Sequence, residues 1–325
     1  LQGIFNNRLV DFAEGVVRHM FFCIRNKYYS SMTTLQEYLK ASDVPGDLGK
    51  IITLISEQAA PIRSAFISNQ SYAGSTNSSG EEQAEMDTWA DTRITGVLRE
   101  SGFVRAVASE EQDEITLMNP SAKYSVVMDP LDGSSLIKVN LCVGTIVGIY
   151  EGDVMQAGKN LKAAFYLLYG PMTTLTITLG SGVCVFAQNA DNTYVLLKEN
   201  VKIPEGNLYG SGGLRTEWLP KHTKYITGIE AEGGKNRYTG SFVADFHQIL
   251  EYGGVYAYPP TKKSMEGKLR LVFEVNPIGF LAVQAGGAVS TGDFCTLDIM
   301  PQKVHQRTPI YVGSKGMIAK IENTR

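Results

Sequence analysis

The segment 129–135 combines residue types that can hold a cation and a phosphate side by side. It directly follows an apolar run at 124–128, which predicts a buried strand that ends in carboxylates. Two aspartates three positions apart can face one cation, with a backbone carbonyl between them as a further oxygen ligand. The glycine and serines that follow offer consecutive N–H groups and hydroxyls to a phosphate. An ordinary β-turn has similar residues, so this segment alone leaves a structural role open. The residues concerned are Asp129, Leu131, Asp132, Gly133, Ser134 and Ser135.

Glutamates extend this set of acidic residues. Glu110 and Glu111 follow a second apolar run at 104–108, although such a pair is often only surface charge. Glu274 lies in the alternating segment 269–275, which predicts a strand, and burying an unpaired carboxylate there would cost several kcal/mol. A metal shared with the aspartates would satisfy it. Oxygen ligands without histidine favour Mg²⁺ or Mn²⁺ over zinc.

The elements that must position these acids are mixed α and β. Apolar residues at helical spacing predict a core helix over 51–66, with a bend at Pro61, and a second helix through 89–98. The Gly/Ser/Asn-rich segment 69–81 between them predicts a flexible loop. Several β-rich runs between 143 and 197 predict a sizeable sheet.

Helix start signals appear at two further places. Thr34 and Glu37 have the spacing of a capping box. Asn276 can cap a helix, and Pro277 can occupy the first turn of that helix, which would run to Gly286.

Composition limits the partners of the chain. At 325 residues with 43% apolar content, it suits two joined subdomains. A net charge of −3 provides no basic excess for nucleic acid or an anionic membrane, and the apolar run at 20–24 is far shorter than the ~20 residues of a membrane span. Four scattered cysteines without metal-ligand spacing predict reduced thiols and a cytoplasmic location. Residues 1–31 are expected to be an extension or a remnant of upstream sequence, with an amphipathic helix at a subunit surface.

Six motifs in a fixed order resemble the class of fructose-1,6-bisphosphatases and sedoheptulose-1,7-bisphosphatases, from about Leu35 to the C-terminus. They are Ser-Glu-Glu at 109–111, DPLDGSS at 129–135, VGTI at 143–146, NRYTGS at 236–241, GKLRL at 267–271 and FEVNP at 273–277. One motif would be weak evidence, whereas their shared order makes the resemblance specific.

The resemblance implies a role for each site residue. Two or three Mg²⁺ ions per subunit, with Mn²⁺ as the alternative, would be bound by Glu110, Glu111, Asp129, the Leu131 carbonyl, Asp132 and Glu274. The catalytic residues would be Glu81, Asp87, Glu111 and Asp132, with Glu81 or Asp87 accepting a proton from the attacking water; Glu81 stands where the family usually has Asp. Substrate would be bound by Gly133, Ser134, Ser135, Arg215, Arg237, Tyr238, Tyr258 and Lys268, with Arg237 reaching in from a neighbouring subunit.

The resemblance also implies a layered α/β/α/β/α fold of two joined subdomains and a homodimer or homotetramer. We expect an N-terminal extension at 1–32, a subdomain with the metal-binding carboxylates at 33–200 and a subdomain for the distal phosphate and sugar at 201–325.

The substrate prediction leans towards sedoheptulose 1,7-bisphosphate, from which the 1-phosphate would be removed. Gly212, Gly213, Leu214 and Arg215 resemble the sedoheptulose pattern, and Arg215 can reach a phosphate displaced outward by the longer sugar. Fructose 1,6-bisphosphate, or both sugars, is the alternative. Two further alternatives are an inositol-phosphate phosphatase, which the basic segment 236–241 disfavours, and a catalytically silent sugar-phosphate-binding protein.

Overall fold

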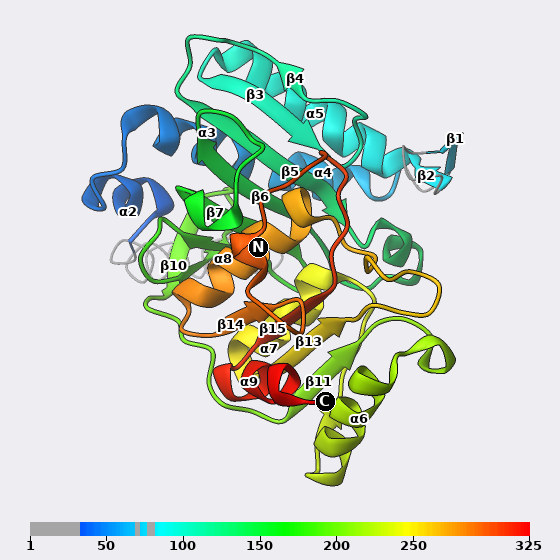
Figure 1. Cartoon of the computed structure of the whole chain (residues 1–325). Helices are drawn as coiled ribbons and strands as arrows, with labels where there is room; N and C mark the ends of the chain where they lie inside the picture. The colour runs from blue at the N-terminus through cyan, green and yellow to red at the C-terminus, as the bar shows by residue number, and fades with distance from the viewer. Residues whose placement is uncertain (1–32, 69–71, 77–81) are drawn as a thin grey trace, which may run out of the picture.

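The computed structural model describes residues 33–68, 72–76 and 82–325. Its elements form five layers, α/β/α/β/α, as the resemblance implied (Figure 1). The predicted helix within residues 1–31 and the loop residues 69–71 and 77–81 lie outside the described part. Within the described part, no helix is both long and apolar enough to span a membrane.

The larger sheet has eight strands in the order β10-β9-β8-β7-β6-β5-β3-β4. Its neighbours are antiparallel, except that β3 and β5 run parallel. Because helices cover both faces, β5 is buried along its whole length. The bounds are β3 Val104–Ser109, β4 Thr116–Leu117, β5 Tyr124–Asp132, β6 Val143–Glu151, β7 Ala163–Tyr169, β8 Thr173–Thr178, β9 Cys184–Gln188 and β10 Tyr194–Lys198.

The smaller sheet has five strands in the order β12-β11-β13-β15-β14. In a separate short hairpin, β1 (Tyr72–Thr76) lies within the segment predicted as a loop, and its partner β2 (Glu82–Ala84) follows that segment. The smaller sheet's bounds are β11 Leu208–Ser211, β12 Lys235–Asn236, β13 Gly254–Tyr258, β14 Ala288–Ser290 and β15 Ile310–Gly313.

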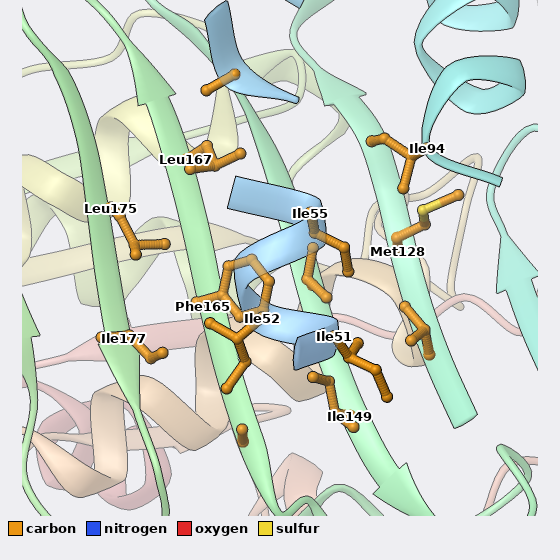
Figure 2. Close-up of a cluster of buried hydrophobic side chains, with 14 of the residues drawn as sticks. Ile51, Ile52, Ile55, Ile94, Met128, Ile149, Phe165, Leu167, Leu175 and Ile177 are labelled. Carbon is orange, nitrogen blue, oxygen red and sulfur yellow. The ribbon is translucent and has the colours of Figure 1, made fainter. Parts of the chain in front are cut away.

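The first helical layer packs on one face of the larger sheet. It contains α2 (Leu35–Ala41), which begins with the predicted capping box at Thr34, then α3 (Gly46–Ser56), α4 (Ala59–Ala65) and α5 (Glu85–Ser101). Isoleucines of α3 meet side chains of the central strands (Figure 2). The labelled residues of that contact are Ile51, Ile52, Ile55, Ile149, Phe165, Leu167, Leu175 and Ile177.

The predicted single helix over 51–66 is in fact two helices. The break lies at 57–58, between α3 and α4, and Pro61 sits in the first turn of α4. Pro61 has no N–H to donate to the Glu57 carbonyl four residues earlier, and the first α4 bond runs from Ile62 N to Gln58 O at 3.0 Å. The proline therefore interrupts the ladder one turn before its own position.

The remaining helices lie on the two faces of the smaller sheet. Helices α7 (Phe242–Tyr252) and α8 (Asn276–Gln284) fill the layer between the sheets, and α6 (Pro220–Ala231) and α9 (Lys315–Asn323) cover the outer face (Figure 1). Short 3₁₀ turns are η1 Ser134–Val139, η2 Gly158–Asn160, η3 Arg215–Glu217 and η5 Thr296–Asp298.

The strand predicted at 269–275 is wrong. Residues Leu271–Val275 form a π-helical turn, η4, that leads directly into α8, and every side chain in it is buried. Because core surrounds this turn on all sides, its apolar pattern resembles a buried strand. Asn276 does not cap α8 with its side chain, since the chain enters the helix already in helical conformation.

Candidate active site

A cavity of about 250 Å³ opens where the parallel strands β3 and β5 end. Carboxyl ends of parallel neighbours meet at one sheet edge, so the acids that follow these strands converge. Glu110 N donates to Met128 O at 3.0 Å, which places the turn after β3 beside the end of β5. The predicted site residues that line the cavity are Asp87, Glu110, Glu111, Asp129, Leu131, Asp132, Gly133, Ser134, Ser135, Tyr238, Tyr258, Lys268 and Glu274.

Three carboxylates from different elements form the centre of this cavity. Glu110, Asp129 and Glu274 each offer an oxygen, and these atoms lie within 4.8 Å of one another. Burial raises the pKa of Asp129 and Glu274 well above the ordinary range, and repulsion from Glu110 and other carboxylates adds to it. An all-oxygen cluster of this kind fits a hard divalent cation such as Mg²⁺ or Mn²⁺.

Arg270 supplies the cation beside this cluster and was missed from sequence. It is 2% exposed, with its Nε 3.5 Å from Glu110 Oε1, and its backbone N–H donates to Glu274 Oε2 at 2.6 Å across η4. A buried arginine needs a carboxylate partner, so its place between Lys268 and Glu274 was the available signal. The arginine partly compensates Glu110 and fixes the direction of Glu274.

Asp132 lies in the same cavity but interacts differently. Its carboxylate accepts from Ser241 Oγ at 2.6 Å and from the N–H groups of Phe242 (3.2 Å) and Val243 (3.0 Å), at the start of α7. Burial raises the pKa of Asp132 to about 6, and these hydrogen bonds oppose the rise. Ser241 was also missed, although a serine directly before an apolar run is a recognised N-cap signal.

The predicted phosphate segment begins at the end of β5. Gly133 adopts φ +79°, and a Cβ there would lie 2.8 Å from Ser241 Cβ, so glycine is required. Ser134 Oγ donates to Asp87 Oδ2 at 2.9 Å, which joins this turn to the first turn of α5. The arrangement brings a predicted proton acceptor beside a predicted phosphate cradle.

Tyrosines and a lysine also line the cavity. Tyr238, Tyr258 and Lys268 line it, and the Tyr238 ring stacks on Tyr256 at 6.3 Å. Asp245 accepts from the N–H groups of Thr239 (2.9 Å) and Gly240 (3.3 Å), which fixes the loop after Tyr238. These side chains can bind the uncharged and distal parts of a phosphorylated sugar.

Three predicted site residues are not brought into the cavity. Arg215 pairs with Glu230 at 3.2 and 3.4 Å, is more than half exposed and does not line the cavity. The Arg237 guanidinium lies 5.5 Å from the centre of the Tyr252 ring, outside the cavity lining. Glu81 lies outside the described residues.

A larger cavity, about 920 Å³, lies between α4 and the β7–β8 and β9–β10 hairpins. Its described lining contains the cation Arg63 and several amides but no carboxylate. The smaller cavity is the candidate active site because the reactive groups converge there.

A five-layer fold with buried carboxylates after parallel strands, beside a glycine-serine turn, is the arrangement expected of a phosphoric monoester hydrolase. Two family models match the chain: "Fructose-1-6-bisphosphatase, N-terminal domain" at residues 31–199 and "Fructose-1-6-bisphosphatase, C-terminal domain" at 203–325. The chain therefore belongs to the fructose-1,6-bisphosphatase family, whose members generally use divalent metal ions.

Similar proteins agree with this family. A protein of Methanocorpusculum labreanum is 76% identical over 95% of this chain and 96% of its own length, and one of Methanospirillum hungatei is 54% identical over 90% and 94%. Both are named fructose-1,6-bisphosphatase class 1. The crystal structure of Leishmania major fructose-1,6-bisphosphatase in holo form matches with a TM-score of 0.85 and 28% identity, over 90% of this chain and 98% of that one. None of these names supports the sedoheptulose preference.

Proposed function

We propose that this enzyme hydrolyses the 1-phosphate of fructose 1,6-bisphosphate to give fructose 6-phosphate, in a reaction that depends on Mg²⁺. The observation behind the proposal is the convergence of Glu110, Asp129 and Glu274 within 4.8 Å, in a cavity that also presents Lys268. The names of the relatives favour fructose over sedoheptulose as the sugar. The predicted contact for the longer sugar, Arg215, is engaged with Glu230 instead.

Two or three Mg²⁺ ions, or Mn²⁺, fit the acidic side of the cavity. Their ligands would be Glu110, Glu111, Asp129, the Leu131 carbonyl, Asp132 and Glu274. When bound, such ions lower the pKa of a water molecule and neutralise charge on the phosphoryl group. Arg270 keeps Glu110 and Glu274 oriented, and the carboxylate of Asp87, or that of Glu81, accepts the proton of the attacking water.

The substrate would span the cavity from the acids to the tyrosines. Gly133, Ser134 and Ser135 would bind the reacting phosphate through N–H and hydroxyl groups. Tyr238, Tyr258 and Lys268 would bind the sugar and the distal phosphate. In a homodimer or homotetramer, Arg237 would reach the distal phosphate of a neighbouring subunit.

The predicted division into 33–200 and 201–325 remains part of this proposal, with metal ligands mainly in the first part and distal-phosphate residues in the second. A cytoplasmic setting is also retained as a prediction, and Cys142, Cys184 and Cys295 are free thiols.

Phosphate release from three substrates tests the proposal. With Mg²⁺, we expect turnover of fructose 1,6-bisphosphate, slower turnover of sedoheptulose 1,7-bisphosphate and little of inositol 1-phosphate. Chelation of the metal should abolish all three activities. A higher kcat/KM for the seven-carbon sugar would overturn the substrate assignment, and no release of phosphate with any metal would favour a silent binding protein.

A further inference from the structure

Gln112 follows the two glutamates after β3, and contacts surround its side-chain amide. Its Nε2 donates to both carboxylate oxygens of Asp91, at 2.9 and 3.1 Å, and lies 3.2 Å from Thr95 Oγ1. Its Oε1 accepts from Thr116 Oγ1 at 2.7 Å. Asp91 lies on α5, one helical turn after Asp87, and is 8% exposed. The amide therefore connects the turn of Glu110 and Glu111 after β3, here called the glutamate turn, to the helix that bears Asp87.

The backbone of Gln112 makes a second tie, to the C-terminal half. Its carbonyl oxygen lies 2.9 Å from His305 Nε2. Because a carbonyl only accepts, Nε2 donates this hydrogen bond. The His305 ring packs on Phe273, at 5.2 Å between centroids. The carbonyl of the next residue, Gln306, accepts from the N–H of Leu271, the first residue of η4, at 2.7 Å. This loop therefore joins the glutamate turn to the turn that bears Glu274.

We propose that Gln112 is a positioning residue that fixes three acid-bearing segments relative to one another before a cation binds. These segments are the first turns of α5, the turn after β3 and η4. The inference depends on the proposed function, because it concerns how the metal site is assembled. Carboxylates brought together without a cation repel one another, and groups that orient ligands typically contribute about 10- to 100-fold in metal affinity or activity.

Replacing Gln112 by Met removes every side-chain hydrogen bond at nearly constant volume. We expect about 10- to 100-fold weaker Mn²⁺ binding to the metal-free protein, measured by calorimetry, and a matching rise in the Mg²⁺ concentration for half-maximal activity. The KM for fructose 1,6-bisphosphate at saturating Mg²⁺ should change little, because Gln112 does not line the described cavity.

A charge swap separates positioning from simple packing. Gln112→Glu alone sets a carboxylate against Asp91 and should weaken Mn²⁺ binding. Adding Asp91→Asn restores one acid and one amide across the same contact, so the double variant should recover much of the affinity. A failure to recover, with both proteins folded, would argue against this contact.

Gln58→Met is the matched control. Gln58 is 6% exposed, donates to Leu54 O at 2.9 Å and accepts from Arg93 Nε at 3.0 Å, in the first helical layer. This change should cost stability but leave Mn²⁺ affinity unchanged. If Gln112→Met does not fold, His305→Phe tests the second tie, because it keeps a ring against Phe273 and removes the Nε2 donor.

The outcomes distinguish this inference from the proposed function. If the wild type binds Mn²⁺ and the folded Gln112→Met and His305→Phe proteins bind it equally well, the positioning role is overturned. If the wild type binds no divalent metal, the proposed function fails and the inference fails with it. Selective loss of affinity in the Gln112 and His305 variants supports both.

Discussion

Two groups of acids in the candidate active site differ in how the fold compensates their buried negative charge. Asp132 receives three donors from Ser241 and the start of α7, so the fold itself compensates its charge. Glu110, Asp129 and Glu274 crowd together, with Arg270 as the partner of Glu110. Burial and repulsion accordingly raise the pKa of Asp129 and Glu274 well above the ordinary range, whereas that of Asp132 rises to about 6. Incomplete compensation, rather than burial alone, marks where a cation is needed.

The largest effect should come from the crowded cluster of Glu110, Asp129 and Glu274. Glu274→Gln keeps an acceptor for Arg270 N but removes a metal-facing charge. Losing several kcal/mol of transition-state stabilisation corresponds to roughly a thousandfold fall in kcat. Stability of the metal-free protein should be unchanged or higher, because repulsion is relieved. Phosphate release measures kcat, and urea unfolding measures the stability of the metal-free protein. Glu199→Gln, on the exposed surface, is the control. Near-normal turnover of Glu274→Gln at saturating Mg²⁺ would show that this carboxylate is not needed to bind the metal.

Asp132→Asn should also lower activity by orders of magnitude, but its effect on stability has the opposite sign. In either orientation the asparagine NH₂ faces a donor from α7 or Ser241, which leaves a buried hydrogen bond unmade. That should lower the free energy of unfolding by about 1–3 kcal/mol. A variant as stable as the wild type in urea would show that α7 does not need this carboxylate.

The stability gained from Mg²⁺ should grow with pH. Asp132, whose ordinary pKa is 3.8, has a pKa of about 6 in the folded protein, and Asp129 and Glu274 are also raised. These acids keep protons in the folded state after the unfolded chain has lost them, so without metal their contribution falls as pH rises through about 4 to 6 and beyond. Metal competes with those protons. Thermal unfolding should show a larger Mg²⁺-induced rise in Tm at pH 8 than at pH 5.5, and an equal or smaller rise would contradict this.

The smallest effect should come from Ser241→Ala. It removes the N-cap of α7 and one of three donors to Asp132, at a cost of about 1 kcal/mol. The backbone N–H groups of Phe242 and Val243 still hold the carboxylate, so kcat should change only a few-fold. Urea unfolding measures the stability cost, and phosphate release measures kcat. A loss of activity as large as that of Asp132→Asn would show that the Ser241 hydroxyl, rather than the two backbone N–H groups, orients Asp132.

The sequence alone was sufficient to predict features that depend on neighbouring residues in the chain. Glu110 and Asp129 were chosen because each directly follows an apolar run, and the structure shows that these runs are neighbouring parallel strands. Thr34 was identified because a capping box is local. Glu274 was chosen for a sound reason, as an acid inside an apolar segment. The element was wrong, because a fully buried π-helical turn has the same apolar pattern as a buried strand.

Contacts between distant segments could not be predicted in this way. Ser241 meets Asp132 across 109 positions, and His305 meets Gln112 across 193. The ion pair between Arg215 and Glu230 of α6 is likewise formed only in the folded chain. Such pairings depend on how the sheets stack, which single-sequence patterns do not specify.

Crystals soaked in Mn²⁺ test the central claim most directly. Anomalous diffraction should give a strong peak among the carboxylate oxygens of Glu110, Asp129 and Glu274, and this peak should be lost in Glu274→Gln. No peak at these carboxylates in the wild type, with Mn²⁺ bound elsewhere or not at all, would contradict the account.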